Sequence, residues 1–158
     1  MELLQELSFL NTRTISCPLN RSGMIKILAS GELAANGIDH GLLIRFNRET
    51  TNYKSFVHMG GDAGLNEWAS EKGYDSGIYT GRNGWGHDAT FMLDYTFTIN
   101  TNYLKVTGSG MSAFALGNNS FLGYESHGVF LANRPVTEIE VGFTGGIVRM
   151  GDLRIYHI

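Results

Sequence analysis

The residues in this chain that can do chemistry gather in a glycine-rich stretch, residues 60–88. This stretch holds both tryptophans, together with tyrosines, an arginine and several acids. Sugar sites stack an aromatic face on the apolar C–H patch of the sugar, while Asp, Asn or Arg bonds the hydroxyls. The candidate contact residues are Trp68, Tyr74, Tyr79, Arg82, Trp85 and Asp88. The alternative is that these aromatic residues pack the stretch onto the rest of the protein or bury a contact between subunits.

Metal and nucleophile patterns are weak by comparison. The five histidines occur without HxH, HExxH or CxxC spacing, and no GxSxG elbow or phosphate-binding loop is present. Cys17 has no histidine near it in the sequence, which favours a buried or incidental thiol over a nucleophile. We therefore expect no metal and no cofactor.

Glycosidase chemistry needs two carboxylates that flank the scissile bond. The acids of the glycine-rich stretch could supply such a pair, but solvated surface is the simpler interpretation. These acids are Asp62, Glu67, Glu71, Asp75 and Asp88. We expect no catalysis.

Composition narrows the class of partner. The chain has 158 residues, 42% of them hydrophobic and only 17% charged, with 21 glycines and 2 prolines. Low charge on a β-rich chain favours an exterior that is partly covered in an assembly. The net charge of −3 and the scattered Lys and Arg residues disfavour nucleic-acid binding. No segment resembles a secretory signal or a membrane span, so we expect synthesis in a cytoplasm and no membrane partner.

Short alternating segments predict the elements that must position these residues. Apolar and polar residues alternate with a period of two over 91–99, over 137–143 and in the closing segment 153–158, as in half-buried strands. Weaker strands are expected at 6–9, 24–28, 42–46, 53–58, 77–79, 104–107, 112–116 and 129–131. Only 1–7 and 65–72 could form a short helix.

Many short strands with almost no helix predict an all-β protein, an antiparallel β-sandwich or jelly roll. We expect one domain over 1–158, with an N-terminal strand or arm at 1–16 and one long glycine-rich loop region at 60–88.

Four segments resemble the small jelly-roll domains of tailed-bacteriophage virion proteins. They are 7–16, 42–47 with 51–53, 93–95, and 136–141 with 151–158. Such domains serve as capsid decoration proteins or as tips of tail fibres and tailspikes. The resemblance implies a β-sandwich, a homotrimer, no cofactor and no catalysis.

Two functions follow as expectations. The first is a non-enzymatic capsid decoration or cement protein, located in the virion, which binds the major capsid protein or tail proteins. The reasons are the short chain, its start at Met1 and the lack of a stem segment. The alternative is a receptor-binding tip or lectin-like module that recognises a host-surface carbohydrate through Trp68 and Trp85, with Arg82 and Asp88 as hydroxyl partners.

Overall fold

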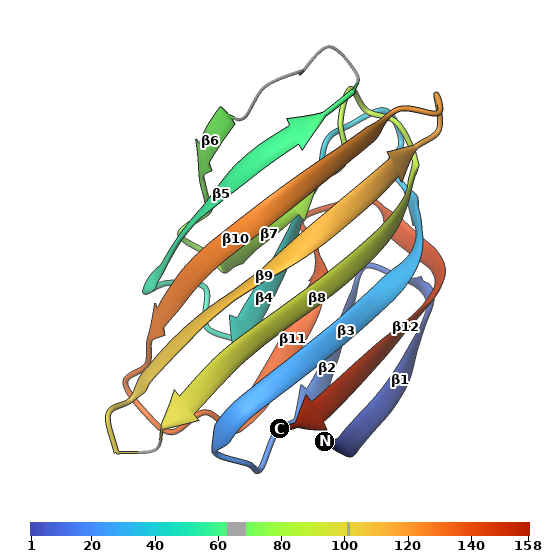
Figure 1. The fold of residues 1–158 in the computed structure, drawn as a ribbon. Helices are drawn as coiled ribbons and strands as arrows, with labels where there is room; N and C mark the ends of the chain where they lie inside the picture. Colours follow the sequence, from blue (N-terminus) through green and yellow to red (C-terminus); the bar gives the residue numbers. More distant parts are fainter. Residues whose placement is uncertain (63–68, 101) are drawn as a thin grey trace.

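Two antiparallel sheets pack face to face in a β-sandwich (Figure 1). A computed structural model describes residues 1–62, 69–100 and 102–158 of the chain, and these contain strands and turns but no helix. The larger sheet has the order β1-β12-β3-β8-β9-β10-β5-β6 and the smaller sheet has the order β2-β11-β4-β7. The predicted all-β sandwich is confirmed.

The strand bounds follow the chain. The eight strands of the larger sheet are β1 (Glu2–Thr12), β3 (Gly23–Ala34), β5 (Tyr53–Gly61), β6 (Ala69–Lys72), β8 (Ala89–Asn100), β9 (Lys105–Leu116), β10 (Phe121–Leu131) and β12 (Ile147–His157). The four strands of the smaller sheet are β2 (Thr14–Pro18), β4 (Gly41–Phe46), β7 (Ile78–Arg82) and β11 (Glu138–Phe143).

The clearest predicted strand lies in β8, within the larger sheet. Its alternate side chains from Phe91 to Ile99 are all at most 3% exposed, because they fill the space between the two sheets. The same alternation buries Ile139 and Val141 of β11 and Leu153 of β12. A period of two along the sequence thus becomes one buried face on each sheet.

Aromatic side chains join the two sheets across the core. Phe46 of β4 meets Phe97 of β8 edge-on at a centroid distance of 5.1 Å, and it stacks on Phe130 of β10 at 5.6 Å. Phe143 of β11 meets Phe91 of β8 edge-on at 5.0 Å. These offset and edge-to-face arrangements are the ones that aromatic pairs prefer.

The N-terminal segment is part of the sandwich. The helix considered for residues 1–7 is wrong, because β1 pairs with β12 and buries Phe9 in the core. After a crossing at residues 12–14 the chain enters β2 and pairs with β11 of the other sheet. Residues 1–16 therefore belong to both sheets, and Glu2 pairs with His157 where the two chain ends meet (Figure 1).

The stretch 60–88 is not one long loop. β5 continues to Gly61, Ala69–Lys72 form the edge strand β6, and β7 runs from Ile78 to Arg82. The helix considered for 65–72 is therefore wrong over 69–72, while residues 65–68 lie outside the described residues. The connections that remain among the described residues are 73–77 and 83–88, together with Asp62 after β5.

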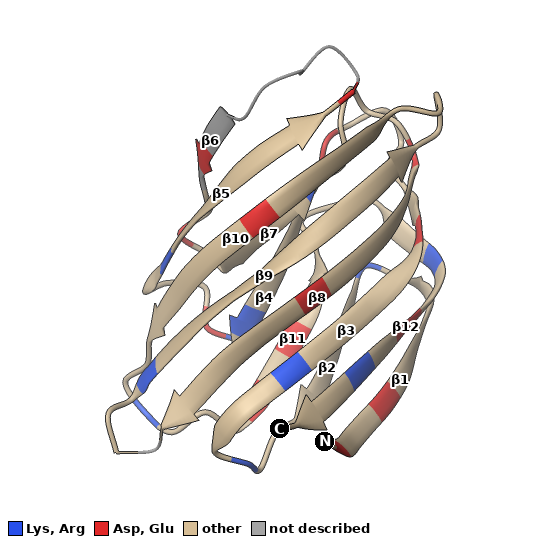
Figure 2. Ribbon diagram, viewed as in Figure 1, with Lys and Arg blue, Asp and Glu red and all other residues tan. Residues whose placement is uncertain are grey.

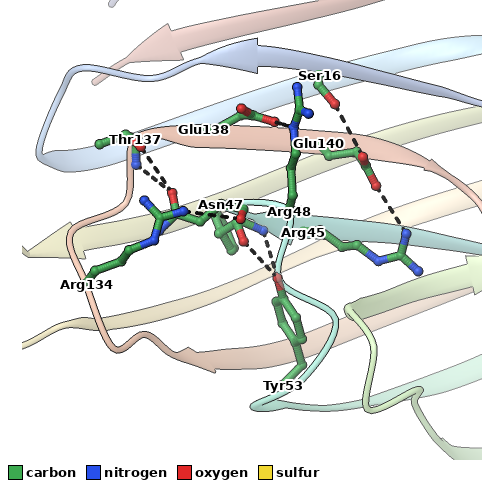
Figure 3. Close-up of polar contacts among 10 residues, drawn as sticks. Ser16, Arg45, Asn47, Arg48, Tyr53, Arg134, Thr137, Glu138 and Glu140 are labelled. Carbon is green, nitrogen blue, oxygen red and sulfur yellow. Dashed lines mark hydrogen bonds and ion pairs between the residues drawn. The ribbon is translucent and has the colours of Figure 1, made fainter.

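Polar side chains cover the outer face of the smaller sheet (Figure 3). Glu140 of β11 accepts hydrogen bonds from Arg45 of β4 at 3.1 Å and from Ser16 of β2 at 3.3 Å. Beside them, Arg48 lies 2.7 Å from Glu138. The outer face of the smaller sheet is therefore polar and suited to contact with solvent. The outer face of the larger sheet is turned toward the viewer in Figure 2, and it carries charged residues on β3, β8 and β10 with uncharged residues between them.

Candidate functional site

Two loops lie side by side at one end of the sandwich: residues 35–40, which join β3 to β4, and residues 83–88, which join β7 to β8. One carboxylate oxygen of Asp39 accepts a hydrogen bond from the Gly86 N–H at 2.7 Å, and the other accepts one from Arg82 at 3.1 Å. Gly86 has φ +70°, and a Cβ there would collide with the carbonyl of Gly37. The close approach of the two loops therefore requires glycine at position 86.

The buried side-chain amide of Asn83 holds both loops in place. Asn83 is fully buried, and its side-chain oxygen accepts a hydrogen bond from the His40 N–H at 2.7 Å. Its amide group donates to the carbonyls of Ile38 at 3.1 Å and His87 at 2.9 Å. One side chain thus satisfies three backbone groups from two loops, so the loop pair is held in place before any ligand arrives.

Trp85 stands on this rigid base. Its side chain is 53% exposed and its backbone has φ +52°, a left-handed conformation that a bulky residue rarely adopts. Such a conformation costs on the order of 1–3 kcal/mol and persists only where the surroundings enforce it. Gly86 and His87 follow Trp85 directly, and their hydrogen bonds hold the loop so that Trp85 keeps this conformation. The loop pair thus presents an exposed indole at this end of the sandwich.

Polar side chains lie next to the same loop. Arg82 ends β7, pairs with Asp39 and approaches Glu71 of β6 at 3.5 Å. Tyr74 is 42% exposed and its ring meets Tyr79 edge-on at 5.3 Å. Partial burial raises the pKa of Tyr74, and the nearby Glu71 carboxylate adds to the rise. The phenol therefore stays a neutral hydroxyl that can donate or accept hydrogen bonds.

The structure separates the predicted contact residues into four groups, the last of which is Asp88. Arg82 and Tyr74 share a charge cluster with Asp39, and Trp85 stands on the loop that Asp39 holds. Tyr79 is 1% exposed and belongs to the core, so its ring cannot meet a ligand at the surface. Trp68 lies outside the described residues.

Asp88 is already engaged within the protein. Its carboxylate accepts a hydrogen bond from the Ala35 N–H at 2.8 Å and lies 3.5 Å from Arg149. The predicted set omitted Asp39, which the structure places at the centre of the loop pair. Its only sequence signal is a turn-forming Asn-Gly two residues before it, at positions 36–37.

The described residues offer no metal-ion site, since nowhere among them do three His, Cys, Asp or Glu side chains converge. None of the described segments is a helix long and apolar enough to cross a membrane.

Three hollows of the molecule lie over the larger sheet. A groove of about 640 Å³ runs over β5, β9 and β10 beside Phe56 and His127. A second of about 600 Å³ lies over β1, β12, β3 and β8, and a third of about 560 Å³ lies beside Met92, Met111 and Phe121. All are open and mainly apolar.

Comparisons with known proteins add only distant likenesses. No family model matches the chain, and no curated protein matches it. Among solved structures, CG-16, a homodimeric agglutinin from chicken liver, is 8% identical with a TM-score of 0.27, over 94% of this chain and 99% of that one. Peanut lectin is 7% identical with a TM-score of 0.23, over 98% and 99%. A chain of the T13 IBDV viral particle is 12% identical with a TM-score of 0.21, over 96% of this chain and 38% of that one. No functional argument rests on likenesses at this level.

Proposed function

We propose that this protein is a non-catalytic carbohydrate-binding module that recognises a glycan with the loop pair 35–40 and 83–88. The observation that carries the proposal is the exposed indole of Trp85, held in a left-handed backbone conformation on the loop that Asp39 and Asn83 fix. A rigid aromatic platform offers a large apolar area at little cost in conformational entropy.

The neighbouring side chains fit the rest of a sugar. The Arg82 guanidinium donates hydrogen bonds, the Asp39 carboxylate accepts them, and the Tyr74 hydroxyl does either. Arg82 and Asp39 keep part of their side-chain surface exposed, 25% and 39% respectively, so they can meet a ligand without a rearrangement of the loops. Trp85 stacks on the C–H face of the sugar, and the charged pair binds its hydroxyls.

Binding to an array of immobilised mono- and oligosaccharides, followed by calorimetry with the tightest binder, tests this proposal. Trp85→Ala should abolish binding while the circular dichroism spectrum stays unchanged. The matched control is Tyr103→Ala, which removes another exposed aromatic side chain from the β8–β9 turn, at the opposite end of the sandwich, and should leave binding intact. Wild-type protein that binds no saccharide, or a Trp85→Ala variant that binds as well as wild type, refutes the proposal.

A second candidate function is that of a structural subunit of a larger particle, such as a decoration protein of a bacteriophage virion. The observation that favours it is the apolar outer face of the larger sheet, which a solitary domain would leave in contact with water. A homotrimer that binds the major capsid protein is the form that the resemblance to virion proteins implies.

Quantitative mass spectrometry of source particles tests this second function. A copy number comparable with that of the major capsid protein supports a shell subunit, and a small fraction of it supports a tail appendage that uses the Trp85 loops as its receptor site. Absence from purified particles excludes both.

A further inference from the structure

The outer face of the larger sheet carries many large apolar side chains, interspersed with charged ones. Nine large apolar side chains, each at least 41% exposed, project from it. They are Leu3, Leu10, Met24, Phe56, Met92, Met111, Phe121, Leu131 and Met150. No element of the described chain packs over this face, which is turned toward the viewer in Figure 2. The outer face of the smaller sheet instead carries ion pairs such as that of Arg45 with Glu140.

The outer face of the larger sheet is uneven, and this unevenness suits contact with another protein. Small residues such as Gly60, Ala113 and Gly123 line up across β5, β9 and β10 and leave hollows beside Met92 and Met111. The methionines rise beside these hollows, so the surface alternates between knobs and depressions. Methionine side chains adapt readily to an opposing apolar surface.

The area is sufficient for a stable contact. Seven strands of 9 to 12 residues at a spacing of about 4.8 Å, with about five outward residues each, cover on the order of 1,100 Å². A standard interface takes about 800 Å² from each partner. One such face against another therefore meets the size of a specific complex.

The charged residues on this face are distributed in a way that suits contact with a second copy of the chain. The strand register places Asp94, Met111 and Glu125 in one row across β8, β9 and β10. The adjacent row holds Thr96, Ser109 and His127, with Lys26 beside Thr96 on β3. Over β8 to β10 the first row carries carboxylates, and the second row carries a histidine with Lys26 beside it. Within the chain Lys26 pairs with Asp94 at 3.0 Å and His127 lies 2.9 Å from Glu125. Toward the β1 edge the first row continues with Arg154, which pairs with Glu6 at 3.4 Å.

The division of charge continues beyond these two rows. The acids Glu32 and Asp152 lie further toward the end that carries Trp85, and the bases Lys54 and Lys105 lie toward the opposite end. A twofold axis that runs across the strands reverses this polarity. It sets the acidic row of one copy against the basic row of the other over β8 to β10. Glu125 of each copy then faces His127 of the other, in addition to the pair that these two residues form within each chain.

We infer that the protein forms a twofold dimer through the outer faces of its two larger sheets. An isologous contact uses the same patch on both copies, and a single broad, self-complementary face meets that condition. The Trp85 loops lie at the ends of the sandwich, outside this contact. The pairing turns strands in opposite directions, so the two loop pairs point away from each other.

Analytical ultracentrifugation of the full chain and of charged variants at the centre of the face tests the dimer. Wild type should sediment as a dimer. Met111→Arg and Ala113→Arg should each raise the dissociation constant at least about 30-fold, the effect of losing an interface hot spot. Both positions are exposed, so the monomer should keep its fold. Tyr103→Arg is the matched control at an exposed position outside the face and should leave the dimer intact.

Charge exchange tests the orientation of the two copies. Glu125→Lys and His127→Glu should each weaken the dimer, and the double variant should restore it. Overturning results are a wild-type monomer over the whole range of concentrations, a dimer that survives both Met111→Arg and Ala113→Arg, or a trimer. These outcomes are independent of the saccharide assay, because Trp85→Ala should leave the dimer intact.

Discussion

The carboxylate of Asp39 accepts a hydrogen bond from the backbone N–H of Gly86, 2.7 Å away, and so ties the loop that carries Trp85 to the loop between β3 and β4. The second oxygen of the same carboxylate holds Arg82. One residue therefore positions both the proposed stacking platform and the proposed hydroxyl donor. Asp39 belongs to neither the loop of Trp85 nor the strand of Arg82, so its role is visible only in three dimensions.

Replacing Asp39 should separate these two roles. Asp39→Ala removes both contacts and should expose the Gly86 amide to rapid hydrogen exchange, with a loss of about 1 kcal/mol of stability. Asp39→Asn keeps an acceptor oxygen for Gly86 but loses the charge that pairs with Arg82, so it should retain most of the exchange protection. Amide exchange followed by NMR measures this. Equal protection of Gly86 in wild type and Asp39→Ala contradicts the tie.

The buried amide of Asn83 should matter more for stability than for ligand contact. Asn83→Ala leaves the His40 N–H and the Ile38 and His87 carbonyls without their partner, which should cost about 3 kcal/mol. For a chain of this length such a loss lowers Tm by about 6–12 °C.

Differential scanning calorimetry measures the effect, and Asn118→Ala is its control. Asn118 also bonds a backbone N–H, that of Ser120 at 3.1 Å, but in an exposed turn where water replaces the lost contact. An Asn83→Ala variant as stable as Asn118→Ala would show that the buried network contributes little.

The sequence predicts the fold well where alternation is strong. Phe91 to Ile99 show both the strand and its buried face, because every second residue is large and apolar. The expected strands at 104–107 and 112–116 are one strand, β9, and most of β10 was missed. In both strands small residues occupy inward positions: Gly108 and Gly110 lie against Tyr95, and Ser126 donates to the carbonyl of Tyr79 at 2.6 Å. Since glycine and serine carry no hydrophobic signal, the alternation disappears from the sequence there.

The site is predictable only in part for a related reason. Residue types singled out Trp85, Arg82 and Tyr74, since exposed aromatic and charged groups gather in one stretch. Those types do not show that Tyr79 packs inward. Nor do they show that Asp39, more than 40 positions before Arg82 in the sequence, supplies the carboxylate of the site. That knowledge depends on the pairing of β4 with β7, which is a long-range feature of the sheet.

Backbone strain at Trp85 should be measurable apart from any ligand. Glycine adopts φ +52° without penalty, whereas alanine does not. Trp85→Gly should therefore be about 1 kcal/mol more stable than Trp85→Ala, which corresponds to about 2–4 °C in Tm. Urea denaturation of the two variants checks this, and neither should bind saccharide. Equal stability of both variants would mean that the loop relaxes when the indole is removed.

Alkaline pH should destabilise the folded protein, because its buried Cys and Tyr side chains must then lose their protons. Burial raises the pKa of Cys17 to about 11, with a further contribution from Glu138, and raises the pKa of Tyr53 to about 12. Burial also raises the pKa values of Tyr95 and Tyr124. The folded state therefore keeps protons that the unfolded chain releases from its ordinary values of 9.0 for Cys and 10.0 for Tyr.

Because the folded state binds more protons, stability should be fully present below pH 9 and should fall as pH rises through the pKa values of Cys17 and then Tyr53. Urea midpoints measured across this range, together with phenolate absorbance, follow the loss. Cys17→Ala should remove the first part of the decline and delay its onset toward pH 10, where the tyrosines of the unfolded chain begin to ionise. Ionisation of Tyr53, Tyr95 and Tyr124 near pH 10 in a chain whose urea midpoint has not moved would refute this account, because buried phenols cannot ionise without a cost to the fold.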